Sequence, residues 1–162
     1  MKKIIYILTI FSALLFLFAC ANNTSEPKSF EDYISTTDFT DFKYDSENDI
    51  YIVSMDLNSI ISDESAIKNF NDSIYDVLHS EVKPDKDVVF RAWDSNITAS
   101  LVYFKKDKFS SLGEEVFDSN ATYQKANGWQ TISKFGQYQS LNDYSDDSTT
   151  ENLLFNLFMI SK

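Results

Sequence analysis

The chain has 162 residues, with 14 basic and 25 acidic side chains, a net charge of −11, one cysteine and one histidine. At roughly 100–200 residues per domain, this length predicts a single domain. The acidic balance argues against a nucleic-acid partner, because binding to phosphates requires basic side chains. One cysteine cannot form an internal disulfide, and one cysteine with one histidine cannot form a typical zinc site. We therefore expect no metal and no bound cofactor.

The N-terminal residues have the composition of an export signal. Lys2 and Lys3 precede an uncharged run over residues 4–19. That run is short for a membrane-spanning helix, which needs about 17–25 apolar residues. A basic start, an apolar stretch and a small residue at its end are typical of a secretory signal peptide.

The end of this run carries a more specific pattern. Leu17-Phe18-Ala19-Cys20 resembles the lipobox of bacterial lipoproteins. The resemblance implies that diacylglycerol is attached to the Cys20 sulfur and that cleavage between Ala19 and Cys20 removes residues 1–19. Cys20 then serves as an attachment point for two or three acyl chains, such as palmitate, which suffice for stable membrane anchoring. The alternative is an ordinary signal peptide or an uncleaved anchor.

The lipobox divides the chain into a cleaved signal peptide (1–19), a lipidated Cys20 with a polar tether up to residue 29, and one domain (30–162). Removal of Lys2 and Lys3 would change the net charge from −11 to −13, which anionic lipid headgroups repel. We expect a domain anchored by its lipid at the extracytoplasmic face of the cell membrane. The richness in Asn, Lys and Ile favours a Gram-positive cell surface over a Gram-negative envelope.

In the first half of the domain, residues 30–48 have a mixed pattern that indicates a short helix or an irregular arm. Residues 50–57 alternate between two faces and predict a strand. Ser62 can cap a following helix, and apolar residues then recur at spacings of three and four. These signals predict an amphipathic helix over 62–82, which ends before Pro84.

The second half begins with two strand-like runs, 87–93 and 97–104, and the three residues between them suit a hairpin turn. The four residues 105–108 predict a solvated turn. Asn127-Gly128 is typical either of a second hairpin turn or of the cap of a preceding helix.

The last segments are less regular. The apolar positions Trp129, Ile132 and Phe135 favour a strand over a helix. Residues 142–151 carry four acids and no base, which predicts an exposed loop. Residues 153–160 form an apolar closing segment that we expect to be buried.

This order of elements predicts an α+β fold, with an antiparallel sheet packed on one main amphipathic helix. The order is similar to the cystatin-like arrangement, in which a sheet wraps around a helix. The resemblance concerns element order alone and implies nothing about function.

Few residues indicate chemistry. His79 lies near the C-terminal end of the predicted helix, off its apolar stripe, and we interpret it as a solvated histidine that suits the helix dipole. No linear motif supplies the nucleophile and acid that a catalytic histidine needs. Tyr123, Trp129 and Tyr138 lie in polar surroundings, and we predict that they form a contact patch, because tyrosine and tryptophan often anchor protein contacts.

Together these features predict a non-enzymatic lipoprotein domain that binds an extracytoplasmic protein or ligand. Two alternatives stay open. One is an exclusion or immunity lipoprotein of a phage or mobile element. The other is a small cell-envelope hydrolase, whose catalytic residues meet only in the folded chain.

Overall fold

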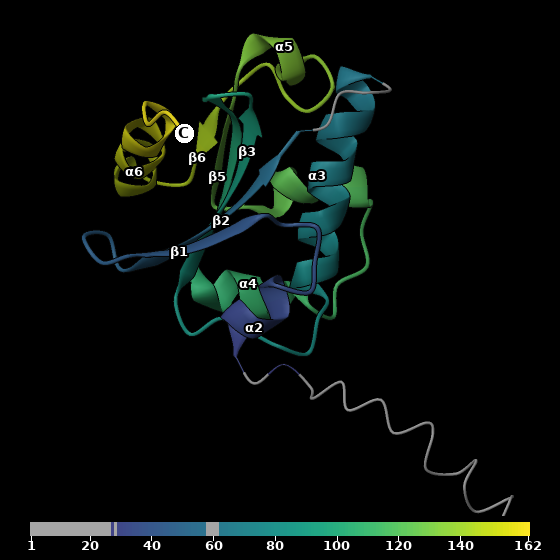
Figure 1. Ribbon diagram of the computed structural model, residues 1–162, viewed down its shortest axis with the longest axis vertical. Coiled ribbons are helices and arrows are strands. Elements are labelled where there is room, and N and C mark those ends of the chain that lie inside the picture. The colour runs from purple at the N-terminus through teal and green to yellow at the C-terminus, as the bar shows by residue number, and fades with distance from the viewer. Residues whose placement is uncertain (1–26, 28, 58–61) are drawn as a thin grey trace, which may run out of the picture.

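The computed structural model describes residue 27 and residues 29–57 and 62–162. The predicted signal peptide, its cleavage position between Ala19 and Cys20, and most of the predicted tether lie outside these residues. The described part consists of a six-stranded sheet with helices on both of its faces (Figure 1).

The strands follow chain order across the sheet: β1 (Asp41–Asp45), β2 (Ile50–Asp56), β3 (Asp87–Asp94), β4 (Ile97–Phe104), β5 (Gly128–Thr131) and β6 (Tyr144–Ser145). Neighbouring strands are antiparallel except β2 and β3, which are parallel. Parallel strands need a crossover connection, since the chain must return to the same end of the sheet. Helix α3 (Asp63–Leu78) lies in that connection. The α+β prediction is confirmed, and the parallel pair is a feature that the sequence did not indicate.

Helix α3 forms where the sequence predicts it and ends four residues earlier. The hydroxyl oxygen of Ser62 accepts a hydrogen bond from the backbone N–H of Ser65 at 3.0 Å, which caps the first turn. His79 follows as the C-cap. The apolar stripe is fully buried against the sheet and includes Ile67, Phe70, Ile74, Val77 and Leu78.

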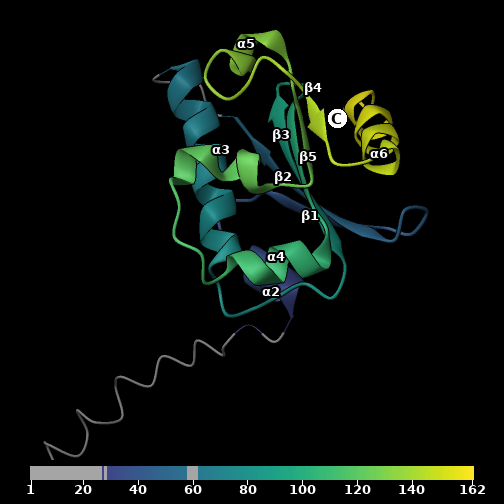
Figure 2. The same ribbon diagram turned by 180° about the vertical axis from the view of Figure 1, so that it is seen from behind.

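Four shorter helices share this face of the sheet with α3: α2 (Phe30–Ile34), α4 (Lys106–Leu112), the 3-10 helix η1 (Ser119–Lys125) and α5 (Ser133–Gly136). Each contributes an aromatic side chain to the same core, namely Phe30, Phe109, Tyr123 and Phe135. Figure 2 shows α3 and these short helices on one side of the strands. We call this side the α3 face.

Helix α6 (Ser148–Phe158) lies on the opposite face (Figure 1). It buries Leu154 and Leu157 in a smaller cluster with Ile52, Val89 and Leu101 of the sheet. We call this side the α6 face. Because helices cover both faces, the central strands β3 and β4 are buried almost throughout.

The hairpin of β3 and β4 is confirmed, with a shorter turn than predicted. Asp94 pairs with Ile97, so only Ser95 and Asn96 connect the strands. Ser95 has a φ of 57°, and two-residue hairpin turns favour such positive φ values because they match the strand twist.

At 105–108 the predicted solvated turn is wrong, because α4 begins at Lys106. Phe109 and Leu112 are buried in the core of the α3 face. These two apolar residues stabilise a helix whose first turn consists of charged residues.

Asn127-Gly128 is not a hairpin turn either. Strand β5 begins at Gly128 and follows η1 after a two-residue gap. The alternative prediction, that Asn127-Gly128 follows the end of a helix, is therefore closer to the structure. The strand prediction is right for Trp129 and wrong for Phe135, which lies in α5.

The N-terminal arm contains both a helix, α2, and an edge strand, β1. The helix agrees with the prediction, whereas the strand was not expected. Its outward positions Asp41 and Lys43 are charged, and charged side chains are typical of edge strands that avoid further pairing.

At the C-terminal end, the predicted loop 142–151 contains β6 and the first turn of α6. The predicted burial of 153–160 holds for Leu154 and Leu157 but not for Phe155 and Met159, whose side chains are 58% and 70% exposed. A helix on the surface of a sheet can bury only one of its sides.

Candidate functional site

A groove lies between α6 and the edge of the sheet formed by β5 and β6. Its lining combines residues 129–130, 143–145, 151–152 and 154–155, and we call it the α6 groove. Its volume of about 430 Å³ falls in the range of roughly 300–1,000 Å³ that is usual for ligand pockets. The lining residues come from three separate parts of the chain, namely β5, the segment around β6, and α6, so the groove forms only when the chain folds.

Aromatic side chains supply the apolar part of the groove. The rings of Trp129 and Tyr144 stack with centroids 4.7 Å apart, and Phe155 of α6 is part of the same lining. Tyr144 is 46% exposed, and Phe155 is among the most exposed large hydrophobic residues. Large aromatic groups that stay exposed beside polar neighbours are typical of contact surfaces.

The polar part of the lining consists of amides, carboxylates and the Ser145 side chain. Gln130 and Asn152 supply the amides, and Asp143 and Glu151 supply the carboxylates, whereas no lysine or arginine lines the groove. The Asp143 carboxylate accepts a hydrogen bond from the backbone N–H of Thr131 at 3.2 Å. Among the described residues, Glu151 has no ion-pair partner. The aromatic side chains of the lining can therefore stack on a ligand, and its amides can hydrogen-bond to it. Its carboxylates can neutralise a positive charge on that ligand.

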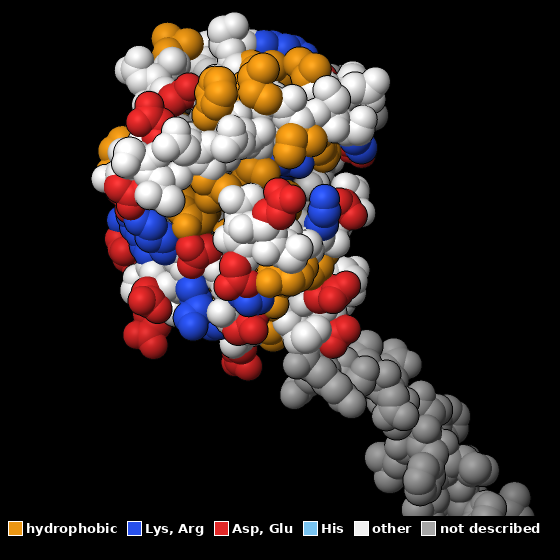
Figure 3. Space-filling view, turned by 90° about the vertical axis from the view of Figure 1, so that its left-hand side faces the viewer, with side chains coloured by type: hydrophobic (Ala, Val, Ile, Leu, Met, Phe, Trp, Pro, Cys, Tyr) orange, Lys and Arg blue, Asp and Glu red, His pale blue; other side chains and the backbone are white. Residues whose placement is uncertain are grey.

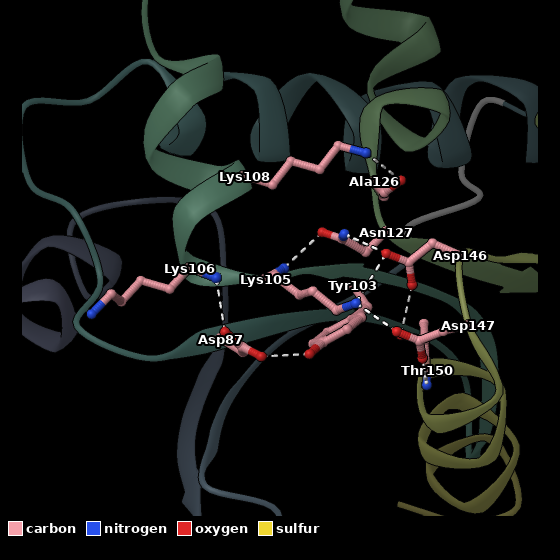
Figure 4. Close-up of polar contacts among 10 residues, drawn as sticks. All are labelled: Asp87, Tyr103, Lys105, Lys106, Lys108, Ala126, Asn127, Asp146, Asp147 and Thr150. Carbon is pink, nitrogen blue, oxygen red and sulfur yellow. Dashed lines mark hydrogen bonds and ion pairs between the residues drawn. The ribbon is translucent and has the colours of Figure 1, made fainter.

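A polar network below the groove fixes the segment that leads into α6 (Figure 4). The Asn127 side chain accepts a hydrogen bond from the backbone N–H of Lys105 at 2.8 Å and donates one to the Asp146 carboxylate at 2.8 Å. The Asp146 carboxylate also accepts a hydrogen bond from the Thr150 hydroxyl at 2.9 Å. These bonds connect the residue that follows β4, the residue that precedes β5 and the first turn of α6.

Two aspartates and one lysine add charge to this network. Lys105 Nζ lies 2.7 Å from Asp147 and 3.0 Å from Asp146. The bond from Lys105, together with the backbone N–H of Thr150, lowers the pKa of Asp147 to about 2. Burial raises the pKa of Asp146, but its hydrogen bonds outweigh this effect and the pKa is lowered. Both carboxylates are therefore ionised at neutral pH and hold the helix start in place.

Tyr103 extends the network to the other side of β4. Its hydroxyl donates a hydrogen bond to Asp87 at 2.5 Å, and Asp87 also accepts one from the backbone N–H of Lys106 at 2.8 Å. Burial, followed by the bond to Asp87, raises the pKa of Tyr103. A phenol that holds its proton so firmly is a poor base or nucleophile, so this pair supports the structure.

The other end of α6 is held by a buried arginine. Arg91 on β3 donates from Nη2 to the backbone carbonyl of Leu157 at 3.0 Å, and its guanidinium lies over the Trp93 ring. Burial lowers the pKa of Arg91. A cation at the last carbonyls of a helix interacts favourably with the helix dipole.

Gly128 allows the close approach of α6 to the sheet. A Cβ atom at this position would lie 2.7 Å from Thr150, 2.8 Å from Leu154 and 3.0 Å from the carbonyl oxygen of Tyr144. Real Cβ atoms essentially never come closer than 3.0 Å to such atoms. The absence of a side chain at Gly128 therefore sets the distance between β5 and α6.

Further apolar residues lie exposed at the C-terminal end of α6 and at the start of β4. Met159 follows Phe155 by one helical turn, and Ile160 and Ile97 are about half exposed. The chain end that contains Ile160 lies along the start of β4, where the Thr98 hydroxyl donates to the Ile160 carbonyl at 3.3 Å. Figure 3, which views the α6 side of the molecule, shows hydrophobic side chains spread over this surface, with acidic and basic groups at its sides and over its lower half.

The predicted contact patch is divided by the fold. Tyr123 is 6% exposed, and its hydroxyl donates to the backbone carbonyl of Gln139, so it belongs to the core. Trp129 packs edge-on against Tyr123, with centroids 5.3 Å apart, and also lines the α6 groove. Tyr138 is 40% exposed. Of the three, Trp129 is the one that lines the groove.

Sequence reasoning missed Tyr144 and Phe155 as groove residues. A signal was present: Thr150, Leu154 and Leu157 recur at helical spacing, and Asp147 is a good N-cap residue. Together they indicate a helix with one buried side, which leaves Phe155 on the other.

His79 differs from its expected solvated state. It is half-buried and stacks on Tyr75. Its Nδ1 lies 2.7 Å from the Tyr75 carbonyl and its Nε2 lies 2.9 Å from the Glu115 carbonyl. Both ring nitrogens therefore contact backbone oxygens, which favours a structural contact between α3 and the segment after α4.

Within residues 29–57 and 62–162, no group of three or more His, Cys, Asp or Glu side chains could hold a metal ion. In the same part of the chain, no helix has the length and apolar character to span a bilayer.

Comparisons with known proteins add no relative. No family model, no curated protein and no solved structure matches this chain.

Proposed function

We propose that this protein is a lipid-anchored, extracytoplasmic binding protein without catalytic activity, and that the α6 groove is its binding site. The observation that carries the proposal is that the exposed Phe155 lines the same groove as the rings of Trp129 and Tyr144. Burying such a ring would be favourable by about 25 cal/mol per Å² of apolar surface. A partner that covers the groove gains this free energy on binding.

The build of the groove supports a binding role. Its walls are fixed by the network around Asn127 and Asp146 at one end of α6 and by Arg91 at the other. A site that is fixed before binding avoids the cost of ordering loops when the ligand arrives. The lipobox at Cys20 supports the anchored location.

The anchor is tested by replacing Cys20 with Ala. We expect the Cys20→Ala chain to lack the lipid and to retain residues 1–19, and the native chain to begin at Cys20 with the mass of an attached diacylglycerol. Intact-mass measurement of membrane fractions distinguishes the two. Native protein with a bare thiol, or with residues 1–19 still attached, would contradict the anchored location.

The binding site is tested by photocrosslinking in the cells that produce the protein. A photoreactive amino acid at Asn152, which is exposed and lines the groove, should yield a discrete crosslinked species. The matched control is the same group at Glu81, an exposed residue between α3 and β3. Equal crosslinking at both positions, or none at Asn152, would count against the groove.

A further inference from the structure

We infer that the α6 groove binds a segment of a partner protein in which a lysine or arginine side chain stands next to apolar ones. This inference rests on the proposed function and specifies the chemistry of the partner. It depends on the charge of the lining, on its aromatic faces and on the charge of the whole chain.

The charge of the groove is unbalanced. Asp143 and Glu151 line it, and no basic residue does. The nearby pair Asp146 and Asp147 is neutralised in part by Lys105, whereas Glu151 has no ion-pair partner among the described residues. An anionic ligand would meet carboxylates without a compensating cation, so the groove selects against phosphate and carboxylate groups.

The aromatic walls add a second reason for a cation. Trp129 and Tyr144 expose parts of a stacked ring pair at the groove, and Phe155 of α6 adds a third ring to the lining. Aromatic faces attract lysine and arginine side chains, and they also pack against apolar groups. A segment that alternates basic and apolar side chains would use both properties of this lining.

Charge also disfavours a second copy of this chain as the occupant. The net charge is −11, and a symmetric contact would place Glu151 and Asp143 of one copy near those of the other. Like charges at close range oppose such association. The same overall charge attracts a basic partner and speeds its approach at low salt.

The inference is tested with the full-length chain in a nonionic detergent and three synthetic peptides. The probes are acetyl-Phe-Lys-Phe-Lys-amide and its versions with glutamine or glutamate in place of lysine. The indole N–H signal of Trp129 in a 15N NMR spectrum reports on the groove, and that of buried Trp93 is the internal control. We expect the lysine peptide to shift the Trp129 signal and the glutamate peptide to leave it unchanged.

Variants then assign the effect to one carboxylate. Glu151→Gln should weaken binding of the lysine peptide about two- to fivefold, the size expected for one exposed ion pair. Glu81→Gln removes the same charge far from the groove and should change nothing. The weakening should disappear at high salt, because salt screens exposed charges.

The outcomes separate this inference from the proposed function. Equal shifts with the lysine, glutamine and glutamate peptides would overturn the charge preference and still locate a ligand in the groove. No shift with the lysine peptide would overturn the inference, while crosslinking at Asn152 continues to test the groove itself. A loss of affinity in Glu81→Gln as large as in Glu151→Gln would also overturn it, because the attraction would then come from overall charge alone.

Discussion

The two faces of the sheet are covered in different ways. On the α3 face, five helices bury a continuous core of large aromatic and aliphatic side chains, and several rings pack directly on one another. On the α6 face, one helix of 11 residues covers the strands with a small aliphatic cluster. This helix leaves Phe155 and Met159 exposed, although the same residue types are buried on the α3 face.

This difference separates folding from binding. The extensive core of the α3 face accounts for the stability of the domain, because buried apolar area is the dominant favourable term in folding. The thin cover on the α6 face leaves apolar surface and unpaired charge at the groove. Substitutions on the two faces should therefore have effects of different size and kind.

The largest effect is expected for Phe70→Ala. Phe70 is fully buried between α3 and the sheet, and its truncation leaves a cavity that the core cannot fill. We expect the free energy of unfolding to fall by about 3–5 kcal/mol, as measured by urea denaturation. A loss below about 1 kcal/mol would show that the α3 face is not the main core.

Gly128→Ala should have an intermediate effect that is local to α6. The added methyl group would overlap Thr150 and Leu154, so α6 must move away from β5 at a cost of about 1–3 kcal/mol. Hydrogen exchange should speed up in α6 and stay unchanged in α3. Gly136→Ala is the matched control, since its Cβ would meet atoms at 3.5 Å or beyond. Equal exchange rates in α6 of both variants would contradict the close contact at Gly128.

A smaller effect concerns the pH dependence at the start of α6. The folded pKa of Asp147 lies at about 2, below its ordinary value of 3.8, so its charge stabilises the fold above about pH 4 and this contribution is lost as the pH falls towards 2. Asp147→Asn keeps an N-cap acceptor and removes the charge. Urea denaturation should show the native chain more stable than the variant at pH 6, with the gap closing near pH 2. A gap that does not change with pH would argue against the ion pair with Lys105.

The smallest effect on stability is expected for Phe155→Ala. More than half of this ring is exposed, so the free energy of unfolding should change by no more than about 0.5 kcal/mol. The free energy of unfolding of this variant is measured by urea denaturation and compared with that of Phe70→Ala, since both variants remove a phenylalanine ring. A loss similar to that of Phe70→Ala would mean that Phe155 belongs to the core.

The core elements could be predicted from the sequence because their signals are local. Helix α3 has a cap and a long apolar stripe, and β3 and β4 are apolar runs joined by a turn. Their burial against each other follows from these patterns. The parallel pairing of β2 and β3 could not be predicted, because it depends on where α3 returns the chain.

The groove was less predictable because its parts meet only through tertiary contacts. Trp129 was selected from its polar neighbourhood, and the same argument selected Tyr123, which lies in η1 and is buried in the core of the α3 face. The sequence around these two residues contains no feature that distinguishes the buried one from the one that lines the groove. The close approach at Gly128 and the network around Asn127 depend on residues about 20 positions apart.

The most direct test combines the crosslinker at Asn152 with Phe155→Ala in the producing cells. If the exposed ring belongs to a binding surface, the yield of the crosslinked species should fall severalfold while the amount of folded, membrane-bound protein stays the same. An unchanged yield would contradict the account, because the surface beside α6 would then make no contribution to recognition.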